Sequence, residues 1–360
     1  MKPSYKALGI GILVLIPAIF AVSANRPPNE PRPIFRQDLH PYGFKTEASG
    51  QTLGNFTDIA FLSDHLVLVT VNTRVFGPVE KIDSDQPPSK LLLFDMSRGT
   101  LLKSFEMPVE KAVGSVKGIQ GGRFALLNES GLRICSSDAE CGSPIDTRGP
   151  LFVSPQGTRI AIGGNGQQEQ KLLDAASLRE LGRFSGRDQS IIPGDSGILL
   201  RQGGKLYTRL PGQPDHPVLF GGLGIWPEAR FINDTTIADF ESDNSLAIAR
   251  IGGDILFRVP VKTRWQVAEV TTASSGSRFC FHEAGYTALN SAINFFDIED
   301  ARPFNFETMK ILSADSGASL LELRWDPRPY VGYLQVPALS TNGRRLALIR
   351  HGILEVFAIP

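Results

Sequence analysis

The sequence shows no excess of charge of either sign: its 360 residues include 37 Lys and Arg and 37 Asp and Glu. It also has no basic stripe of the kind that follows a nucleic-acid backbone, so we expect no nucleic-acid partner. Histidine and cysteine are scarce, with five and three residues. No histidine has a second histidine or cysteine at metal-ligand spacing. We therefore predict neither a metal site nor a bound cofactor.

Catalytic signatures are missing as well. Gly194-Asp-Ser-Gly197 copies the residues around the nucleophile of trypsin-like serine proteases. The Gly-Pro that follows in those proteases is absent, and no segment matches the one that carries their histidine. A cluster of Gly, Asp and Ser before an apolar strand is typical of a turn. We therefore assign no catalytic residue.

A long uncharged run stands near the N-terminus. Two lysines precede it, residues 7–24 are mainly apolar, and Val22-Ser-Ala24 offers small or medium residues before a cleavage point. This order predicts a secretory signal peptide over residues 1–24. The alternative is an uncleaved membrane anchor, because 18 such residues are just long enough to span a bilayer. Either way we expect the body to be exported, to the periplasm or the extracellular space, and to meet a membrane only through residues 7–24.

Residues 25–34 contain four prolines, which exclude a helix or a central strand and predict an extended linker. Beyond residue 35 helical periodicity is almost absent. Short strands rich in β-branched or aromatic residues are instead interrupted by Gly, Asp, Asn and Ser every 8–12 residues. This pattern is typical of an all-β sandwich, barrel or propeller.

Internal repeats decide among these folds. Three segments share a glycine-containing turn followed by an apolar strand: 154–162, 273–281 and 340–348. With looser copies included, the strands after these turns begin at Leu66, Phe124, Ile160, Ile198, Ile237, Phe279 and Leu346. Four of the six spacings (58, 36, 38, 39, 42 and 67) lie close to the period of a four-stranded propeller blade. The repeats therefore predict a seven-bladed β-propeller of four-stranded antiparallel blades over residues 35–360.

Through these turns, and through hairpins such as Leu93-Phe-Asp-Met-Ser-Arg-Gly99, the chain resembles the WD40/YVTN-type β-propeller superfamily. It departs from true WD40 proteins because their Gly-His signature is missing and its one Trp-Asp pair, Trp325-Asp326, follows the last strand of the sixth repeat. The resemblance implies a fold and a general habit of binding partners. The last repeat lacks an outermost strand, and residues 35–44 are predicted to supply it and so close the ring.

Two of the spacings exceed the others by about 19 and 28 residues. The excess falls at Asn72–Ser89 and at His282–Thr308, between the second and third strands of blades 1 and 6. In the propeller superfamily, such connections share one face with the loops that link successive blades. Blades 1 and 6 flank blade 7 in a closed ring, so the two insertions are predicted to stand near each other on one face.

Aromatic residues mixed with charged ones make these insertions suited to binding a protein. The candidate binding residues are Arg74, Phe76, Lys81, Asp83, Tyr286, Phe295, Phe296 and Phe304. The alternative is that the aromatic residues of the second insertion pack onto their own blade as an extra hairpin.

Two of the three cysteines stand close together. Cys135 and Cys141 are separated by five residues inside a predicted hairpin of the second blade. In an exported protein they could form a disulfide, provided that the hairpin brings their Cα atoms to about 5.5 Å. Cys280 lies in a predicted strand and is expected to be a buried free thiol.

Together these features predict an exported, non-catalytic β-propeller that binds a protein partner through the face formed by blades 6, 7 and 1. The alternative is a propeller enzyme or enzyme subunit, because the superfamily includes lactone hydrolases and the large subunits of quinoprotein amine dehydrogenases. Buried charged residues that converge in the central channel would favour that alternative.

Overall fold

The computed structural model describes residues 31–44, 52–55, 57–76, 88–107, 113–128, 130–147, 149–163, 169–185, 190–191, 197–202, 205–209, 214–218, 230–233, 235–241, 245–250, 254–261, 267–285, 306–325 and 337–360. The chain separates into two units, Met1–Arg32 and Pro33–Pro360, and the fold described below is that of the second unit. Within the described ranges the one helix is the short 3-10 helix η1 (His40–Tyr42), and none is long and apolar enough to cross a bilayer.

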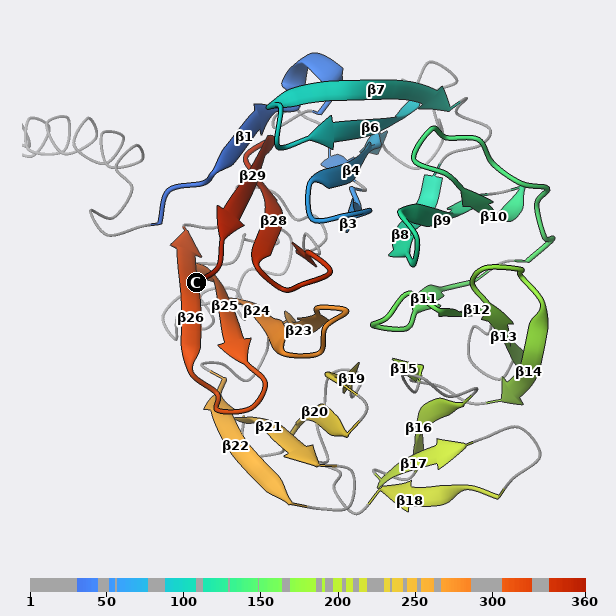
Figure 1. Cartoon of the computed structure of the whole chain (residues 1–360), viewed down its shortest axis with the longest axis vertical. Coiled ribbons are helices and arrows are strands. Elements are labelled where there is room, and N and C mark those ends of the chain that lie inside the picture. The colour runs from blue at the N-terminus through green and yellow to red at the C-terminus, as the bar shows by residue number, and fades with distance from the viewer. Residues whose placement is uncertain are drawn as a thin grey trace, which may run out of the picture. The chain divides into compact units, whose positions relative to one another are not determined.

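Seven antiparallel sheets stand in a ring, which confirms the predicted seven-bladed propeller (Figure 1). The strands are given from the centre of the ring outwards. Blade 1 contains β3 (Ile59–Phe61), β4 (Leu66–Val71), β6 (Ser89–Asp95) and β7 (Thr100–Met107); blade 2 contains β8 (Val113–Ile119), β9 (Arg123–Asn128) and β10 (Gly131–Cys135). Blade 3 contains β11 (Leu151–Val153), β12 (Arg159–Gly163), β13 (Glu169–Asp174) and β14 (Glu180–Ser185). Blade 4 contains β15 (Ser190–Ile191), β16 (Ile198–Gln202), β17 (Lys205–Arg209) and β18 (His216–Val218), and blade 5 contains β19 (Arg230–Phe231), β20 (Thr236–Phe240), β21 (Ser245–Arg250) and β22 (Ile255–Pro260). Blade 6 contains β23 (Val267–Thr272), β24 (Arg278–Gly285), β25 (Phe306–Ser313) and β26 (Ser319–Trp325), and blade 7 contains β27 (Ala338–Leu339), β28 (Arg345–Arg350), β29 (Ile353–Ala358) and β1 (Phe35–Asp38).

The repeat pattern places the strands correctly. All seven predicted strand starts lie on the second strand of a blade: β4, β9, β12, β16, β20, β24 and β28. The glycine of the repeat turn has a left-handed backbone, with φ of 71° at Gly157 and 66° at Gly276. A Cβ atom at Gly157 would lie 2.6 Å from the backbone nitrogen of Gln120 in the preceding blade. Glycine is therefore needed both for the turn and for the close approach of neighbouring blades.

The hydrophobic core lies between the blades. One cluster joins blades 1 and 2 through Leu68, Leu93, Phe124 and Leu126, and similar clusters lie at the other described interfaces. Because each sheet buries both faces against its neighbours, its strands read as nearly continuous apolar runs.

The predicted ring closure is confirmed. β1 pairs antiparallel with β29, from Phe35 opposite Val356 to Asp38 opposite Ile353. Phe35 is buried and its ring centroid lies 6.0 Å from that of Phe94 in blade 1, so the closing strand also packs against the first blade. The N-terminal strand thus covers an edge that would otherwise be open for pairing.

Blade 2 differs from the prediction because its sheet has three strands. The outer position is taken by a segment that makes two isolated bridges, from Leu132 to Ile145 and from Cys135 to Cys141. Pro144 in that segment has no backbone N–H to give to a ladder, which disfavours a regular strand. Cys135 and Cys141 form a disulfide, and Cys280 is buried and belongs to no disulfide.

Candidate functional site

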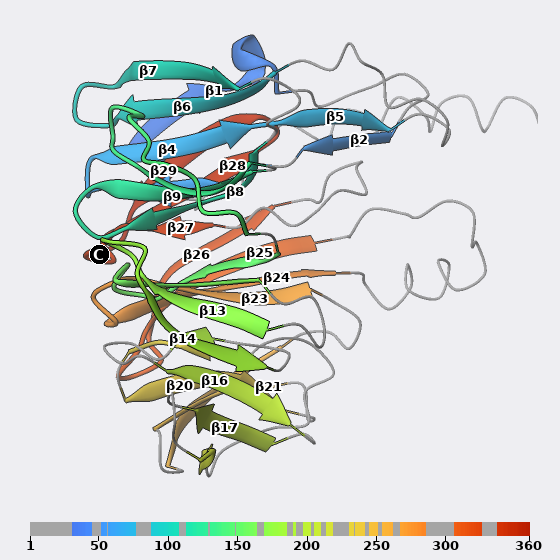
Figure 2. The same ribbon diagram turned by 90° about the vertical axis from the view of Figure 1, so that its right-hand side faces the viewer.

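The long connections predicted from the repeat spacing follow the second strands of blades 1 and 6. In blade 1, β4 is succeeded almost at once by β5 (Thr73–Phe76), which pairs with β2 (Thr52–Asn55). These two strands form a ribbon that extends beyond the ends of the other blades on one side of the ring (Figure 2). The segment predicted as a loop over Asn72–Ser89 therefore begins with a strand, because residues before β3 supply a pairing partner for it.

Blade 7, between blades 6 and 1, has the shortest possible connection at the same position. β28 and β29 pair as far as Arg350 opposite Ile353, so His351 and Gly352 alone make the turn. Both have left-handed backbones, with φ of 49° and 75°, as a two-residue hairpin turn requires. The second strands of all blades run in the same direction, so this turn lies on the same face as the ends of β4 and β24.

The candidate binding residues fall in two groups. Arg74 and Phe76 lie on β5, whose backbone is described but whose side chains are not. The remaining six lie outside the described residues: Lys81, Asp83, Tyr286, Phe295, Phe296 and Phe304. Their role in binding stays a prediction.

A buried polar pair stands where blade 6 leads into its long connection. His282 Nε2 on β24 lies 2.8 Å from Glu307 Oε1 on β25, and the two side chains are 1% and 10% exposed. Glu283 and Thr308, which face each other in the same hairpin, are fully buried. The predicted insertion His282–Thr308 includes both residues, but its two ends are strand, because β24 continues to Gly285 and β25 begins at Phe306. The sequence did not reveal the pair, because its members meet only through the strand register.

Blade 7 carries a second buried pair close to its turn. Arg350 Nε and Nη2 each lie 2.5 Å from Glu355 Oε2, and the Arg350 guanidinium stacks 5.5 Å from the ring centroid of Phe357. Arg36 of β1 approaches the same carboxylate at 3.6 Å. Charge-assisted hydrogen bonds of this kind hold the strand ends of blade 7 in a fixed arrangement.

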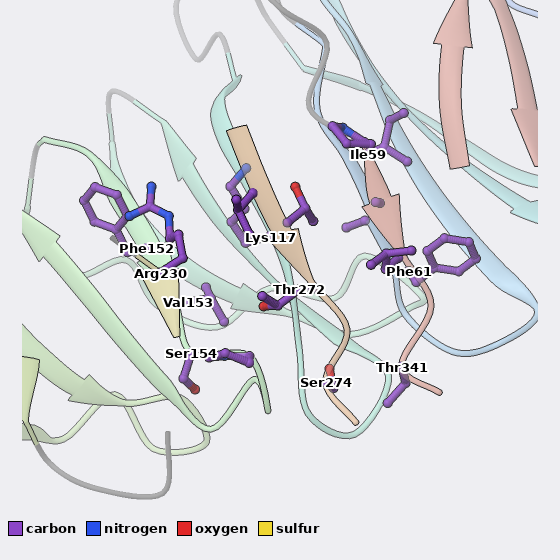
Figure 3. A pocket seen from close by; sticks show the side chains of 18 of the residues that line it. Ile59, Phe61, Lys117, Phe152, Val153, Ser154, Arg230, Thr272, Ser274 and Thr341 are labelled. Carbon is purple, nitrogen blue, oxygen red and sulfur yellow. The ribbon is translucent and has the colours of Figure 1, made fainter. Parts of the chain in front are cut away.

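The centre of the ring contains a cavity of about 250 Å³ lined by the innermost strands β3, β8, β11, β19, β23 and β27 (Figure 3). Lys117 and Arg230 are the charged residues among its described lining. Apolar residues such as Ile59, Val153 and Leu339 form much of the remaining wall. The described lining of this cavity therefore includes two charged residues, and one of them is paired with a carboxylate, because Lys117 Nζ lies 3.2 Å from Asp58 Oδ1.

Two carboxyl groups with lowered pKa values, those of Asp95 and Asp174, lie on hairpins between third and fourth strands. The Ser97 hydroxyl, 2.5 Å from Asp95 Oδ1, lowers the pKa of Asp95. The Ser177 hydroxyl, 2.9 Å from Asp174 Oδ1, does the same for the pKa of Asp174 with help from backbone N–H groups. The hydrogen bonds that cause these shifts stabilise the two turns.

The described residues contain no group of three or more His, Cys, Asp or Glu placed to hold a metal ion. His40 lies 2.6 Å from Asp38 beside β1, and His65 Nδ1 lies 3.3 Å from Arg345 Nη1 at the junction of blades 7 and 1. The Gly194-Asp-Ser segment lies outside the described residues, directly before β16.

Comparison with known proteins supports the fold. No protein-family model and no curated protein matches the sequence. Among solved structures 711 chains match. A fold that is shared so widely does not indicate a particular ligand. Hsv2 of Kluyveromyces lactis, solved with its complete loop 6CD, is similar over 83% of this chain and 90% of its own, with a TM-score of 0.51 and 8% identity. At that identity the likeness shows the β-propeller fold alone.

Proposed function

We propose that this protein is an exported, non-catalytic β-propeller of the WD40/YVTN type that binds a partner protein through the face formed by blades 6, 7 and 1. The observation that carries the proposal is the contrast between neighbouring connections. Blade 7 turns with His351 and Gly352 alone, whereas the blades on either side have long connections at the same position. We expect a partner to contact the short turn of blade 7 together with the insertions of the blades on either side.

Rigid support favours this use of the face. The pairs His282–Glu307 and Arg350–Glu355 are buried at the bases of the connections of blades 6 and 7. These contacts fix the ends of the strands on this face, and a preorganised support reduces the conformational entropy lost when a partner binds. The aromatic and charged residues of the two insertions match the composition of protein interfaces.

Export is supported by three features. Residues 1–24 have the order of a signal peptide or membrane anchor, and residues 25–34 are suited to an extended spacer. The Cys135–Cys141 disulfide fits an oxidising compartment, such as the periplasm or the extracellular space.

The test compares the intact protein with a variant in which residues 77–87 and 286–305 are replaced by short glycine-containing turns. These cuts spare β5 and the buried His282–Glu307 pair, so the blades keep their described contacts. The control replaces residues 219–229, a connection of the same length as 77–87 between blades 4 and 5. Circular dichroism and urea unfolding establish that all three proteins fold.

Each protein is crosslinked in its native envelope, and the captured proteins are identified by mass spectrometry. We expect the intact protein and the control to capture a partner that the doubly trimmed variant loses. Capture of the same partners by all three proteins, or capture of none by any, contradicts the proposal.

A further inference from the structure

A disulfide lies at the outer edge of blade 2, where the other blades have a fourth strand. β10 is the outermost strand of this blade (Figure 1), and residues 136–147, here called the outer segment, follow it. Cys135 is the last residue of β10, and Cys141 of the outer segment is bridged directly opposite to it. The disulfide between these two residues therefore joins the edge strand to the segment that covers it.

Backbone hydrogen bonds also hold the outer segment against β10. Leu132 and Ile145 exchange two of them, at 3.0 and 2.8 Å, and the Gly142 N–H donates to the Ile134 carbonyl at 3.0 Å. Residues 140–144 are all exposed, and hydrogen bonds of exposed backbone open at a low cost in free energy. The disulfide is therefore the strongest link between the outer segment and β10.

The two cysteines of the disulfide differ in accessibility. Cys141 is an exposed residue, whereas Cys135 is fully buried among apolar residues of blades 1 and 2. A thiolate reduces a disulfide by attacking one sulfur and expelling the other, and exposed disulfides are the more readily reduced ones. We therefore expect attack at Cys141, with Cys135 as the leaving group.

An arginine lies on the same side of β10 as the leaving sulfur. Arg133 precedes Cys135 by two residues in this strand, so both side chains stand on the face that packs toward blade 1. Arg133 Nε is buried and has no hydrogen-bond partner among the described residues. A neighbouring arginine stabilises a thiolate, and a more stable thiolate leaves faster. Arg133 is thus placed to assist the opening of the disulfide.

We propose that the Cys135–Cys141 disulfide is a redox switch, which a dithiol opens while the protein stays folded. One thiolate of the dithiol bonds to Cys141 Sγ, the bond between the two cysteines breaks, and Cys135 leaves as a thiolate that takes up a proton. The second thiol of the dithiol, after losing its proton, attacks the mixed disulfide. The dithiol is thereby oxidised to a cyclic disulfide, and Cys141 becomes a thiol.

Opening of the disulfide releases the outer segment and leaves the edge of β10 free to pair with another strand. The switch lies in blade 2, outside the face formed by blades 6, 7 and 1. The measurements below use the purified full chain without a partner protein, so their outcome does not depend on the proposed binding face.

Reduction with excess dithiothreitol tests the opening. Iodoacetamide labels the thiols at successive times, mass spectrometry locates the labels, and circular dichroism follows the fold. Cys280 is the internal control, because it is buried in blade 6 and belongs to no disulfide. We expect Cys135 and Cys141 to be labelled at least about tenfold faster than Cys280, with an unchanged spectrum. A disulfide that resists reduction, or labelling of Cys280 at the same rate as the pair, overturns the proposal.

Hydrogen exchange identifies the part of the protein that is released. We expect the amides of Leu132, Gly142 and Ile145 to exchange at least about tenfold faster after reduction, whereas those of β28 and β29 keep their rates. The double variant Cys135→Ser, Cys141→Ser should show the same fast exchange without reductant. If this variant does not fold, the reduced natural chain decides. Unchanged exchange of the three amides after reduction overturns the proposal.

Variants of Arg133 test its part in the opening. Arg133→Gln removes the charge and is expected to slow reduction by dithiothreitol about threefold or more, whereas Arg133→Lys retains most of the rate. Arg344→Gln is the matched control, because it removes one positive charge from an exposed residue of blade 7. Equal rates of reduction in Arg133→Gln and in the unchanged protein contradict the role of Arg133 in the switch.

Discussion

Neighbouring blades approach each other closely at the repeat turn, and this approach predicts how far Gly157→Ala lowers the free energy of unfolding. Gly157 has φ of 71°, and its carbonyl accepts a hydrogen bond from the backbone N–H of Gln120 at 3.0 Å. An added Cβ would lie 2.6 Å from that nitrogen and 3.0 Å from the Cα of Ile119. The neighbouring backbone must therefore move.

Two costs add at this position. A left-handed backbone costs alanine about 1–2 kcal/mol relative to glycine, and overpacking against backbone costs about 1–3 kcal/mol. We therefore expect Gly157→Ala to lower the free energy of unfolding by about 2–5 kcal/mol. Gly99 separates the two costs, because its φ is 66° but a Cβ there would meet nothing within 4 Å. Gly99→Ala should lose only the first part, about 1–2 kcal/mol.

Urea unfolding at pH 7, followed by circular dichroism, measures both variants against the unchanged protein. Gly276→Ala provides a second case, since its Cβ would lie 2.6 Å from the Cβ of Asn233 in blade 5. The reasoning is refuted if Gly157→Ala and Gly276→Ala are no more destabilising than Gly99→Ala. Equal values would mean that only the backbone conformation, and not the contact between blades, requires glycine.

Three further predictions concern other parts of the ring. Asp174→Asn should lower the free energy of unfolding by about 1 kcal/mol at pH 7. Folding lowers the pKa of Asp174 below its ordinary value of 3.8, so the difference between the two proteins should persist above that pH and vanish as the pH falls through the folded-state pKa. Urea unfolding across about pH 2.5–7 measures this difference. Reduction of the Cys135–Cys141 disulfide should cost about 2 kcal/mol, seen as a lower urea midpoint with reductant, and an unchanged midpoint would contradict a stabilising bond. Removal of residues 31–44 should expose the edge of β29 and cause self-association in analytical ultracentrifugation, whereas a stable monomer would show that β1 is not needed to cover it.

Local sequence patterns predicted the blades well, because each depends on a few neighbouring residues. Turns rich in glycine or in small polar residues located the second strand of every blade, and the Asp95 hairpin located the step from third to fourth strand in blade 1. The missing outer strand of the last repeat likewise predicted the closure by Phe35–Asp38.

Features that depend on contacts distant in sequence were missed. The ribbon of β2 and β5 forms because Thr52–Asn55 pairs with Thr73–Phe76 across two intervening strands of blade 1. Lys117 and Arg230 belong to blades 2 and 5, so only closure of the ring brings them to one cavity. No spacing rule in the sequence connects such residues, because their proximity arises from the arrangement of whole blades.

The most direct test of the proposed binding face uses two photoreactive residues on the same blade. One replaces His351, exposed in the two-residue turn of blade 7, and the other replaces Arg344, exposed on the opposite face of that blade. Irradiation in the native envelope should crosslink a partner protein from position 351 and not from position 344. Crosslinking from position 344 alone, or equally from both, would contradict the assignment of the face formed by blades 6, 7 and 1.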